Sequence, residues 1–298
     1  MIRTFGELLL AVQGKPAKTI AVVSPEGSEV VKLIKAARAQ RLADFVLVGA
    51  IEKVRALAAE FELALDGMEL LDVPHPKDAA AAAVRLVVAG RAEALMKGNL
   101  PTATFLKAIL DKETGLSDQR IISEVTLYEK EDGEGLQILT DCAINISPDL
   151  AEKVRIIDNA VRLARTLGYE RPKVAVLSAV EVVNPALPDT LDAAVLSKMA
   201  ERGQIRDCVI DGPLAFDNAV SREAAAYKNL HGEVAGQADI LLAPNLQVAN
   251  PLHKALVFWA HKEIATAVLG ARAPIVMTSR SDSMETMLYT IALASYIS

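Results

Sequence analysis

The chain has 298 residues, of which 52% are hydrophobic and 4% aromatic, and its formal net charge is −6. This length suits two domains or one large α/β unit. The acidic balance without a basic run argues against nucleic acid and anionic membranes as partners, and two cysteines are too few for a disulfide framework, so we expect a reduced, cytoplasmic protein.

The first third of the chain alternates short β-rich runs with helices of 3.6-residue period. An amphipathic helix is expected over residues 1–15, and its apolar run is short for a signal peptide. The alternation then predicts strands at 19–24, 45–48, 68–73 and 94–96, and helices at 29–41, 52–61, 79–89 and 102–110. This pattern is typical of a parallel sheet covered by helices on both faces.

The pattern changes at residues 121–128 and 135–140, two strand-like runs around a charged turn that holds Gly133. Such a turn predicts an antiparallel hairpin, which we interpret as the seam between two α/β halves. Alternation then resumes, with helices expected at 149–167, 191–202, 221–230 and 252–261, strands at 173–178, 208–211, 240–243 and 274–277, and a final helix. No apolar run free of charge reaches about 18 residues, so no transmembrane span is expected.

The most informative stretch begins where the predicted strand 274–277 runs into Thr278-Ser279-Arg280-Ser281-Asp282-Ser283. A helix with an apolar stripe follows. Ligands of open α/β proteins bind at the carboxyl ends of strands, and a helix start favours anions. A planar arginine at this place suits a phosphate or a carboxylate.

Three other loops carry candidate residues. Lys97-Gly98 lies between a predicted strand and a predicted helix. Two interpretations are open: Lys97 and the helix start bind a phosphate, or Lys97 is a solvated lysine beside an ordinary glycine turn. Asp211 and Asp217 follow another predicted strand. They could serve as a base or as metal ligands, but the sequence favours the interpretation that they are turn and cap residues. Asn250 and Lys254 face one cleft, or Asn250 is only the N-cap of the next helix.

Other familiar sites are missing from the sequence. Residues 24–28 lack dinucleotide-loop spacing and a Walker lysine, and we interpret them as a turn or an N-cap. No G-x-S-x-G elbow is present, the four histidines are scattered, and neither Cys142 nor Cys208 has a histidine close in sequence. Both cysteines are interpreted as small buried apolar residues.

Four segments together, in this order, resemble the phosphate acetyltransferase and phosphate butyryltransferase family. They read ALMKGNLPTATFLKAILDKETGL (94–116), VAVLSAVEVVNPALPDTLDAAVLSKMAERGQI (174–205), DGPLAFDNAVS (211–221) and APIVMTSRSDSMETMLYTIALA (273–294). The KG segment and the DGPLAFDNA form are more similar to the butyryl branch. The loop NLQVANPLHK departs from the family, which commonly has a glycine before its Asn-x-x-x-Lys pair.

The resemblance implies reversible transfer of a short acyl group between coenzyme A and inorganic phosphate by direct thiol attack in a ternary complex. It also implies an isocitrate/isopropylmalate dehydrogenase-like fold with an interdomain cleft, as a homodimer. The expected domains are residues 1–145 with 278–298, and 146–277. No metal and no tightly bound cofactor are implied; acyl-CoA, phosphate and acyl phosphate are the expected small-molecule partners.

The same resemblance assigns roles to residues. Arg280 grips the phosphoryl group and Ser279 hydrogen-bonds the carbonyl oxygen, while Asp282 and Glu285 are both candidates for the base. The expected contacts with substrate and coenzyme A are Lys97, Gly98, Asp211, Asp217, Asn250, Lys254 and Thr278. Two alternatives stay open: a metal-dependent hydroxy-acid dehydrogenase of related fold, and a non-catalytic sensor of acyl-CoA or phosphate. The acyl group is not fixed by the sequence.

Overall fold

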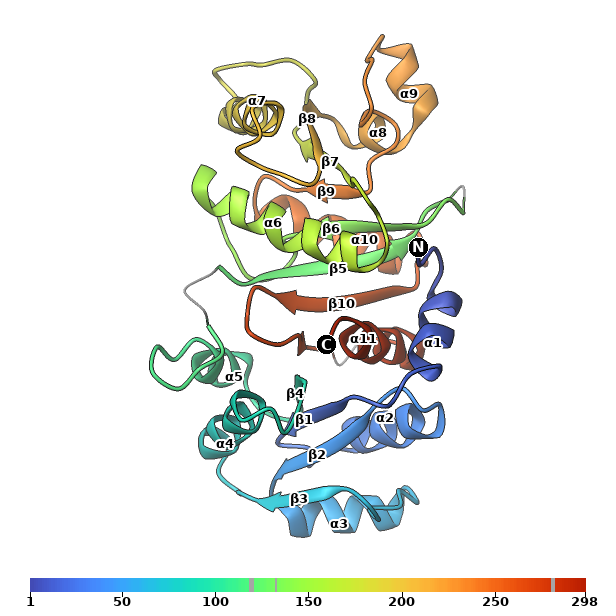
Figure 1. Ribbon diagram of the computed structural model, residues 1–298, viewed down its shortest axis with the longest axis vertical. Coiled ribbons are helices and arrows are strands. Elements are labelled where there is room, and N and C mark those ends of the chain that lie inside the picture. Colours follow the sequence, from blue (N-terminus) through green and yellow to red (C-terminus); the bar gives the residue numbers. More distant parts are fainter. Residues whose placement is uncertain (118–120, 132, 280–281) are drawn as a thin grey trace. The chain divides into compact units, whose positions relative to one another are not determined.

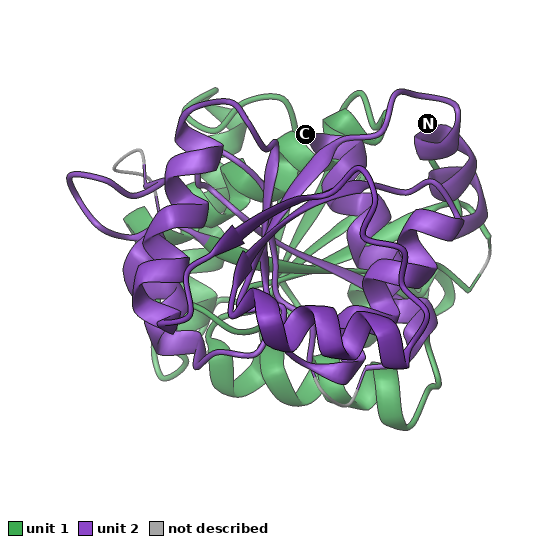
Figure 2. Cartoon of the chain, turned by 90° about the horizontal axis from the view of Figure 1, so that it is seen from below, with its two compact units in different colours: residues 1–4, 123–263 green, residues 5–122, 264–298 purple. Residues whose placement is uncertain are grey.

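The computed structural model describes residues 1–298 except 118–120, 132 and 280–281. The chain forms two compact units (Figure 2): unit 1 contains Met1–Thr4 and Ser123–Glu263, and unit 2 contains Phe5–Ile122 and Ile264–Ser298. This division differs from the domains expected from the sequence, residues 1–145 with 278–298 and 146–277. The hairpin belongs to unit 1, and residues 264–277 belong to unit 2.

Unit 2 is built on six strands in the order β3-β2-β1-β4-β11-β10. Their bounds are β1 Thr19–Val23, β2 Asp44–Gly49, β3 Glu69–Asp72, β4 Ala94–Lys97, β10 Ile264–Leu269 and β11 Ile275–Val276. Pairing is parallel from β3 to β11, as predicted, and antiparallel between β10 and β11. Strand β10 was not expected.

The helices of unit 2 are α1 Phe5–Gln13, α2 Ser28–Ala39, α3 Ile51–Glu60, α4 Pro76–Val88, α5 Thr102–Ile109 and α11 Met284–Ile297. Helices α4 and α5 lie on one side of the strands, and α2 and α11 lie on the other (Figure 1), so both faces are covered as predicted. The alanine run of α4 is a packing device: Ala79, Ala80 and Ala83 are buried, and their small side chains let the helix approach β1 and β2 closely.

Unit 1 contains five strands in the order β5-β6-β9-β7-β8. They are β5 Ser123–Glu129, β6 Leu136–Thr140, β7 Lys173–Leu177, β8 Val209–Leu214 and β9 Ile240–Leu242. Strands β5 and β6 form the predicted antiparallel hairpin, with Val125 opposite Thr140, and the other pairs are parallel. The carboxyl ends of β6, β7 and β9 therefore meet at one edge.

The helices of unit 1 are α6 Leu150–Thr166, α7 Pro188–Glu201, α8 Phe216–Val220, α9 Arg222–Tyr227 and α10 Leu246–Phe258. The helix expected at 221–230 is confirmed as α9, Arg222–Tyr227, and the short helix α8 before it was not expected. Ser221 has extended backbone and caps α9 by accepting a hydrogen bond from the Ala224 amide, so it separates α8 from α9. Helix α6 begins with a capping box in which Asp149 and Glu152 each accept a hydrogen bond from the other's backbone N–H.

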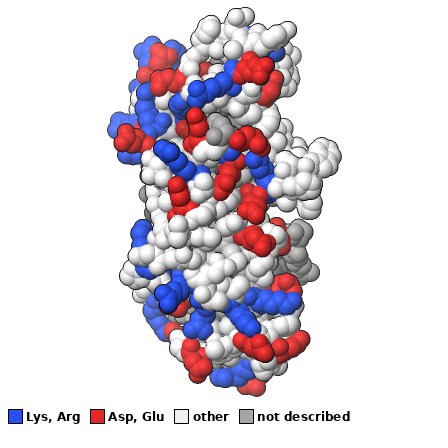
Figure 3. Space-filling view, turned by 90° about the vertical axis from the view of Figure 1, so that its right-hand side faces the viewer, with Lys and Arg blue, Asp and Glu red and all other residues white. Residues whose placement is uncertain are grey.

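The surface of the face drawn in Figure 3 has Lys and Arg interspersed with Asp and Glu, rather than a broad field of one sign. Within the described ranges, no helix is both long enough and apolar enough to cross a bilayer.

Candidate active site

Strand pairing in unit 2 brings two of the predicted loops to one sheet edge. Strands β4 and β11 are parallel neighbours, with Leu95 opposite Ile275 and Met96 opposite Val276. Lys97 ends β4, and Thr278 stands two residues beyond β11. The lysine and the Thr-Ser pair thus follow the carboxyl ends of adjacent strands, where ligands of open α/β sheets bind.

Gly98 has a packing role at this edge. Its N–H donates to the Val23 carbonyl at 2.8 Å, and a Cβ on Gly98 would lie under 3.0 Å from the carbonyl oxygens of Val23 and Ser24. Only glycine lets the loop after β4 lie this close to the end of β1. The sequence predicted a contact with an anion here; the close backbone approach explains the glycine without one.

The turn after Thr278 is tied by an acidic side chain. The Ser279 N–H donates to Asp282 Oδ2 at 2.7 Å, and the Asp282 N–H donates back to the Ser279 carbonyl at 3.2 Å. Burial raises the pKa of the Asp282 carboxyl, and the bond from Ser279 opposes that shift. Arg280 lies outside the described residues. Ser279 is exposed, and its backbone N–H is held by Asp282.

Glu285, the second candidate base, has a different environment. It is exposed in the first turn of α11. Ser283 is the N-cap of this helix and accepts a hydrogen bond from the Thr286 N–H at 3.1 Å. A carboxylate in a first helical turn interacts favourably with the helix dipole. Asp282, in contrast, accepts a hydrogen bond from the Ser279 backbone N–H.

Residues 24–28 contain buried polar atoms that the predicted turn did not lead us to expect. Ser24 is fully buried with a left-handed φ of 49°, and its Oγ has no hydrogen-bond partner among the described residues. The buried Glu26 Oε2 likewise has no described partner, and the Glu26 carbonyl accepts from Asn99 Nδ2 at 3.2 Å. Sequence analysis missed them because Ser-Pro-Glu-Gly is also a common turn; their place directly after β1 was the available signal.

In unit 1, the prediction that Asn250 caps the following helix is wrong. Helix α10 starts at Leu246, capped by Asn245, whose side chain accepts from the Val248 N–H at 3.1 Å. Asn250 lies inside the helix, and its Nδ2 donates to the Cys142 carbonyl at 3.1 Å. Lys254 is exposed and lies four residues further, on the same face of α10.

The loop that receives Asn250 is organised by Asp141, which follows β6 and is only 4% exposed. Its Oδ1 accepts the N–H groups of Glu124, Ala143 and Ile144, each at 3.1 Å. Its Oδ2 accepts the Asn145 N–H at 3.0 Å and also the Asn145 side-chain amide. One buried carboxylate therefore fixes the position of the Cys142 carbonyl. The sequence reasoning did not single out Asp141.

The structure does not bring the two predicted aspartates together. Asp211 lies within β8 rather than after it, accepts from the Gly212 N–H at 2.8 Å, and lines a hollow with Lys198 and Cys208. Asp217 is exposed on α8 and lines a separate hollow with Lys228. The strand predicted to end at residue 211 in fact continues to Leu214, which explains the difference.

Comparison with known proteins identifies the family. Residues 73–295 match the model of the family described as phosphate acetyl/butaryl transferase. The chain belongs to this family. It is 43% identical over 297 residues to a phosphate butyryltransferase of Clostridium acetobutylicum, covering all of this chain and 99% of the relative, and 40% identical to a phosphate acetyltransferase of Thermotoga maritima, covering 98% and 99%.

A solved structure agrees. A branched-chain phosphotransacylase from Enterococcus faecalis V583 matches with a TM-score of 0.83 and 31% identity, over 94% of this chain and 98% of that one. The predicted family and the predicted class, a phosphate acyltransferase with a mixed α/β fold, are confirmed.

A phosphate acyltransferase that passes the acyl group directly between the thiol of coenzyme A and phosphate needs no enzyme thiol. Burial raises the pKa of the Cys142 thiol well above its usual value, and burial raises that of Cys208 to about 11. Both thiols are therefore protonated at neutral pH and are poor nucleophiles. Burial lowers the pKa of His253 on α10, and its Nδ1 hydrogen-bonds Thr126 Oγ1 at 2.9 Å.

Proposed function

We propose that this chain transfers a short acyl group reversibly between coenzyme A and inorganic phosphate. The observation that carries the proposal is the edge formed by β4 and β11 in unit 2, where Lys97 and Thr278-Ser279 follow neighbouring parallel strands. A lysine next to two hydroxyls and the start of a helix suits a phosphate or an acyl phosphate.

The reaction exchanges one bond of the acyl carbon for another. An oxygen of phosphate attacks the thioester carbonyl carbon, the carbon–oxygen bond forms, and the carbon–sulfur bond breaks. The thiolate of coenzyme A leaves with the electron pair of that bond and takes up the proton lost by phosphate. The site must hold the phosphate dianion and the oxyanion that develops on the carbonyl.

We assign the two charges to the residues after β11. Arg280 pairs with the phosphate oxygens in a forked geometry, and the hydroxyl of the exposed residue Ser279 donates to the developing oxyanion. Lys97 adds a second positive charge from the neighbouring strand. The support for these roles is the match to the family motif and the place of Lys97 and Ser279 on one edge.

Asp282 is the better of the two candidate bases. A general base is most effective when its pKa lies near the working pH, and burial raises the pKa of Asp282 in that direction. Its bond to the Ser279 N–H also keeps the carboxyl beside the hydroxyl-bearing residue. We propose that Asp282 takes the proton from phosphate and returns it to the leaving thiolate.

The contacts with coenzyme A are proposed for unit 1. Asn250 and Lys254 share a face of α10, and the Asp141 loop holds Asn250 in place. Asp211 and Asp217 stay predictions. We further propose an isocitrate/isopropylmalate dehydrogenase-like domain pairing, a homodimer and no tightly bound cofactor, as the family resemblance implies, and a cytoplasmic location, which the low cysteine count favours.

The proposal is tested by following free thiol release from acetyl-, propionyl-, butyryl- and isobutyryl-CoA, with and without phosphate and with no metal added. We expect release only when phosphate is present, and the order of kcat/KM identifies the acyl group, with butyryl expected first. Folded protein that releases no thiol from any of the four would refute the proposal.

A further inference from the structure

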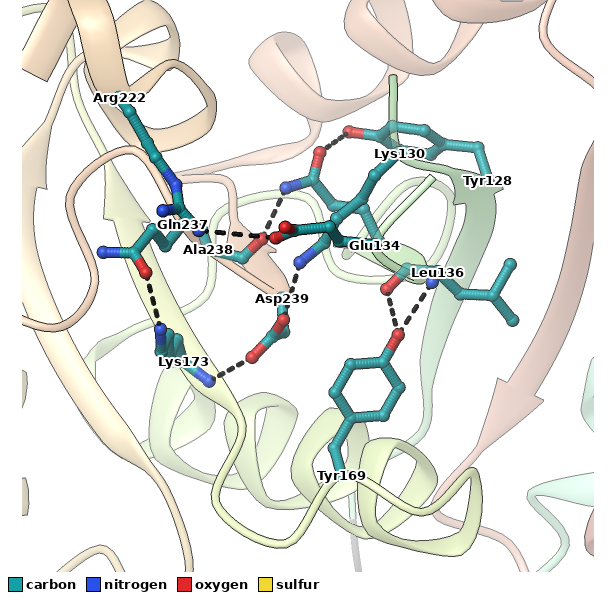
Figure 4. Close-up of polar contacts among 11 residues, drawn as sticks. Tyr128, Lys130, Glu134, Leu136, Tyr169, Lys173, Arg222, Gln237, Ala238 and Asp239 are labelled. Atoms are coloured by element: carbon teal, nitrogen blue, oxygen red, sulfur yellow. Dashed lines mark hydrogen bonds and ion pairs between the residues drawn. The ribbon is translucent and has the colours of Figure 1, made fainter. Parts of the chain in front are cut away.

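Unit 1 contains a hollow of about 500 Å³ that plays no part in the proposed reaction. We call it the hairpin pocket, because the β5–β6 hairpin forms one wall with Tyr128, Lys130 and Gln137. The first residue of β7, Lys173, and the segment just before β9, residues 237–239, form its floor. Figure 4 shows these groups converging on one space. Its volume lies in the range of small-molecule sites.

The hairpin pocket lies at the opposite strand edge from the candidate coenzyme A contacts of unit 1. It is next to the start of β6 at Gln137, whereas the Cys142 carbonyl that receives Asn250 follows the end of β6. Three residue steps along β6, about 10 Å, and two further residues separate them. A ligand in the hairpin pocket would therefore be distinct from one bound at Asn250.

The floor of the pocket is rigid and its polar groups are satisfied. Lys130 and Asp239 form an ion pair at 2.7 Å, with side chains 15% and 13% exposed. Asp239 also accepts from the Lys173 N–H at 2.9 Å, and Gln137 links Tyr128 to the Ala238 carbonyl. These bonds hold the shape of the hollow without a ligand.

Lys173 differs from Lys130 because its ammonium group is bonded to a neutral side chain. Its Nζ donates to the neutral Gln237 Oε1 at 3.1 Å, and it forms no ion pair with a described carboxylate (Figure 4). The side chain is partly buried. A partly buried ammonium that no described carboxylate pairs with favours an anion in this part of the pocket.

The eight Lys, Arg, Asp and Glu side chains that line the pocket are formally balanced: Lys130, Lys173, Arg222 and Lys262 against Glu129, Glu131, Glu134 and Asp239. The positive and negative side chains are not equally exposed. Lys262 is 20% exposed, but its partner Glu131 is 88% exposed, and the Arg222–Glu134 pair lies 65% and 63% exposed. Exposed pairs contribute little, so Glu131 and Glu134 can turn into water while Lys173 and Lys262 keep facing inward.

The rest of the wall is apolar. Helix α10 contributes Leu256, the segment after it contributes Ala260, and helix α8 contributes Val220. The Tyr169 hydroxyl donates to the Leu136 carbonyl and accepts from the Leu136 N–H. We propose that the hairpin pocket binds a small organic anion, a carboxylate or a phosphate ester with an apolar body, and that Lys173 and Lys262 are its charged partners. This site does not depend on the proposed function.

Calorimetric titration of the full chain with benzoate, phenyl phosphate and the neutral benzamide tests the proposal. We expect both anions to bind and benzamide not to bind. Lys173→Met should weaken binding at least about tenfold, the loss of one charge-assisted contact, and Lys262→Met should act in the same direction. Glu131→Gln, which removes a competing carboxylate, should tighten binding about two- to fivefold.

Lys53→Met is the matched control, because Lys53 is exposed on α3 in unit 2 and does not line the pocket. Fluorescence of Trp259, the single tryptophan, reports binding independently since it precedes Ala260 of the wall. The proposal is overturned if neither anion binds, if benzamide binds equally well, if Lys173→Met and Lys262→Met bind like the wild type, or if Arg280→Ala abolishes binding instead.

Discussion

Asp141→Asn is the substitution whose effect can best be worked out from the structure. The carboxylate accepts five hydrogen bonds, three on Oδ1 and two on Oδ2, and the residue is 4% exposed. An asparagine amide has one oxygen, so at least two donors lose their acceptor and face an NH₂ group instead. Each bond to a charged group contributes about 1.5–3 kcal/mol. We expect the free energy of unfolding to fall by about 3–5 kcal/mol.

The assay is equilibrium unfolding in urea at pH 7, followed by circular dichroism, with Asp44→Asn as the control. Asp44 is exposed at the start of β2, so its substitution should change stability by less than about 0.5 kcal/mol. Because the Cys142 carbonyl moves with the loop, Asp141→Asn should also raise the KM for acyl-CoA through Asn250. A loss below about 1 kcal/mol would refute the reasoning on Asp141.

Three further substitutions probe unit 2. Gly98→Ala should cost about 1–3 kcal/mol of unfolding free energy in a urea titration, because the new Cβ overlaps the Val23 and Ser24 carbonyls; an unchanged midpoint would contradict the close approach. Asp282→Asn should raise the free energy of unfolding at pH 7 but not below about pH 4. The pKa of the Asp282 carboxyl is raised in the folded protein, so the wild type loses stability as pH rises through that pKa, whereas asparagine does not ionise. An equal gain in unfolding free energy at both pH values would count against the raised pKa. Arg280→Ala should lower turnover at least about tenfold while the exposed Arg272→Ala does not, and equal rates in both would remove Arg280 from the site.

The parallel strands and covering helices of unit 2 were predictable because each element carries its own hydrophobic period. Strand β10 was missed because Ile264–Leu269 contains two alanines and follows α10 without a glycine or proline to separate them. The start of α10 was misplaced for a related reason. Asn250-Pro251 imitates an N-cap followed by proline in the first turn, although Asn245 is the cap.

The candidate site was predictable where a motif sits at a strand end and not where the contacts are distant in sequence. Lys97 and Ser279 follow the ends of the predicted strands at 94–96 and 274–277, and the structure shows that these strands are neighbours. The Asp141 network could not be anticipated, since the Glu124 N–H comes from the facing strand and Asn250 from a helix over 100 residues away. Local sequence gives no sign of such pairings.

The central claim is that the acyl group passes from coenzyme A to an oxygen of phosphate. It is tested most directly by incubating the protein with butyryl-CoA and phosphate that carries ¹⁸O in all four positions, followed by mass spectrometry of the acyl phosphate. The account predicts butyryl phosphate that retains four labelled oxygens, formed in equal amount with free coenzyme A. Coenzyme A released together with butyrate, without labelled butyryl phosphate, would contradict it.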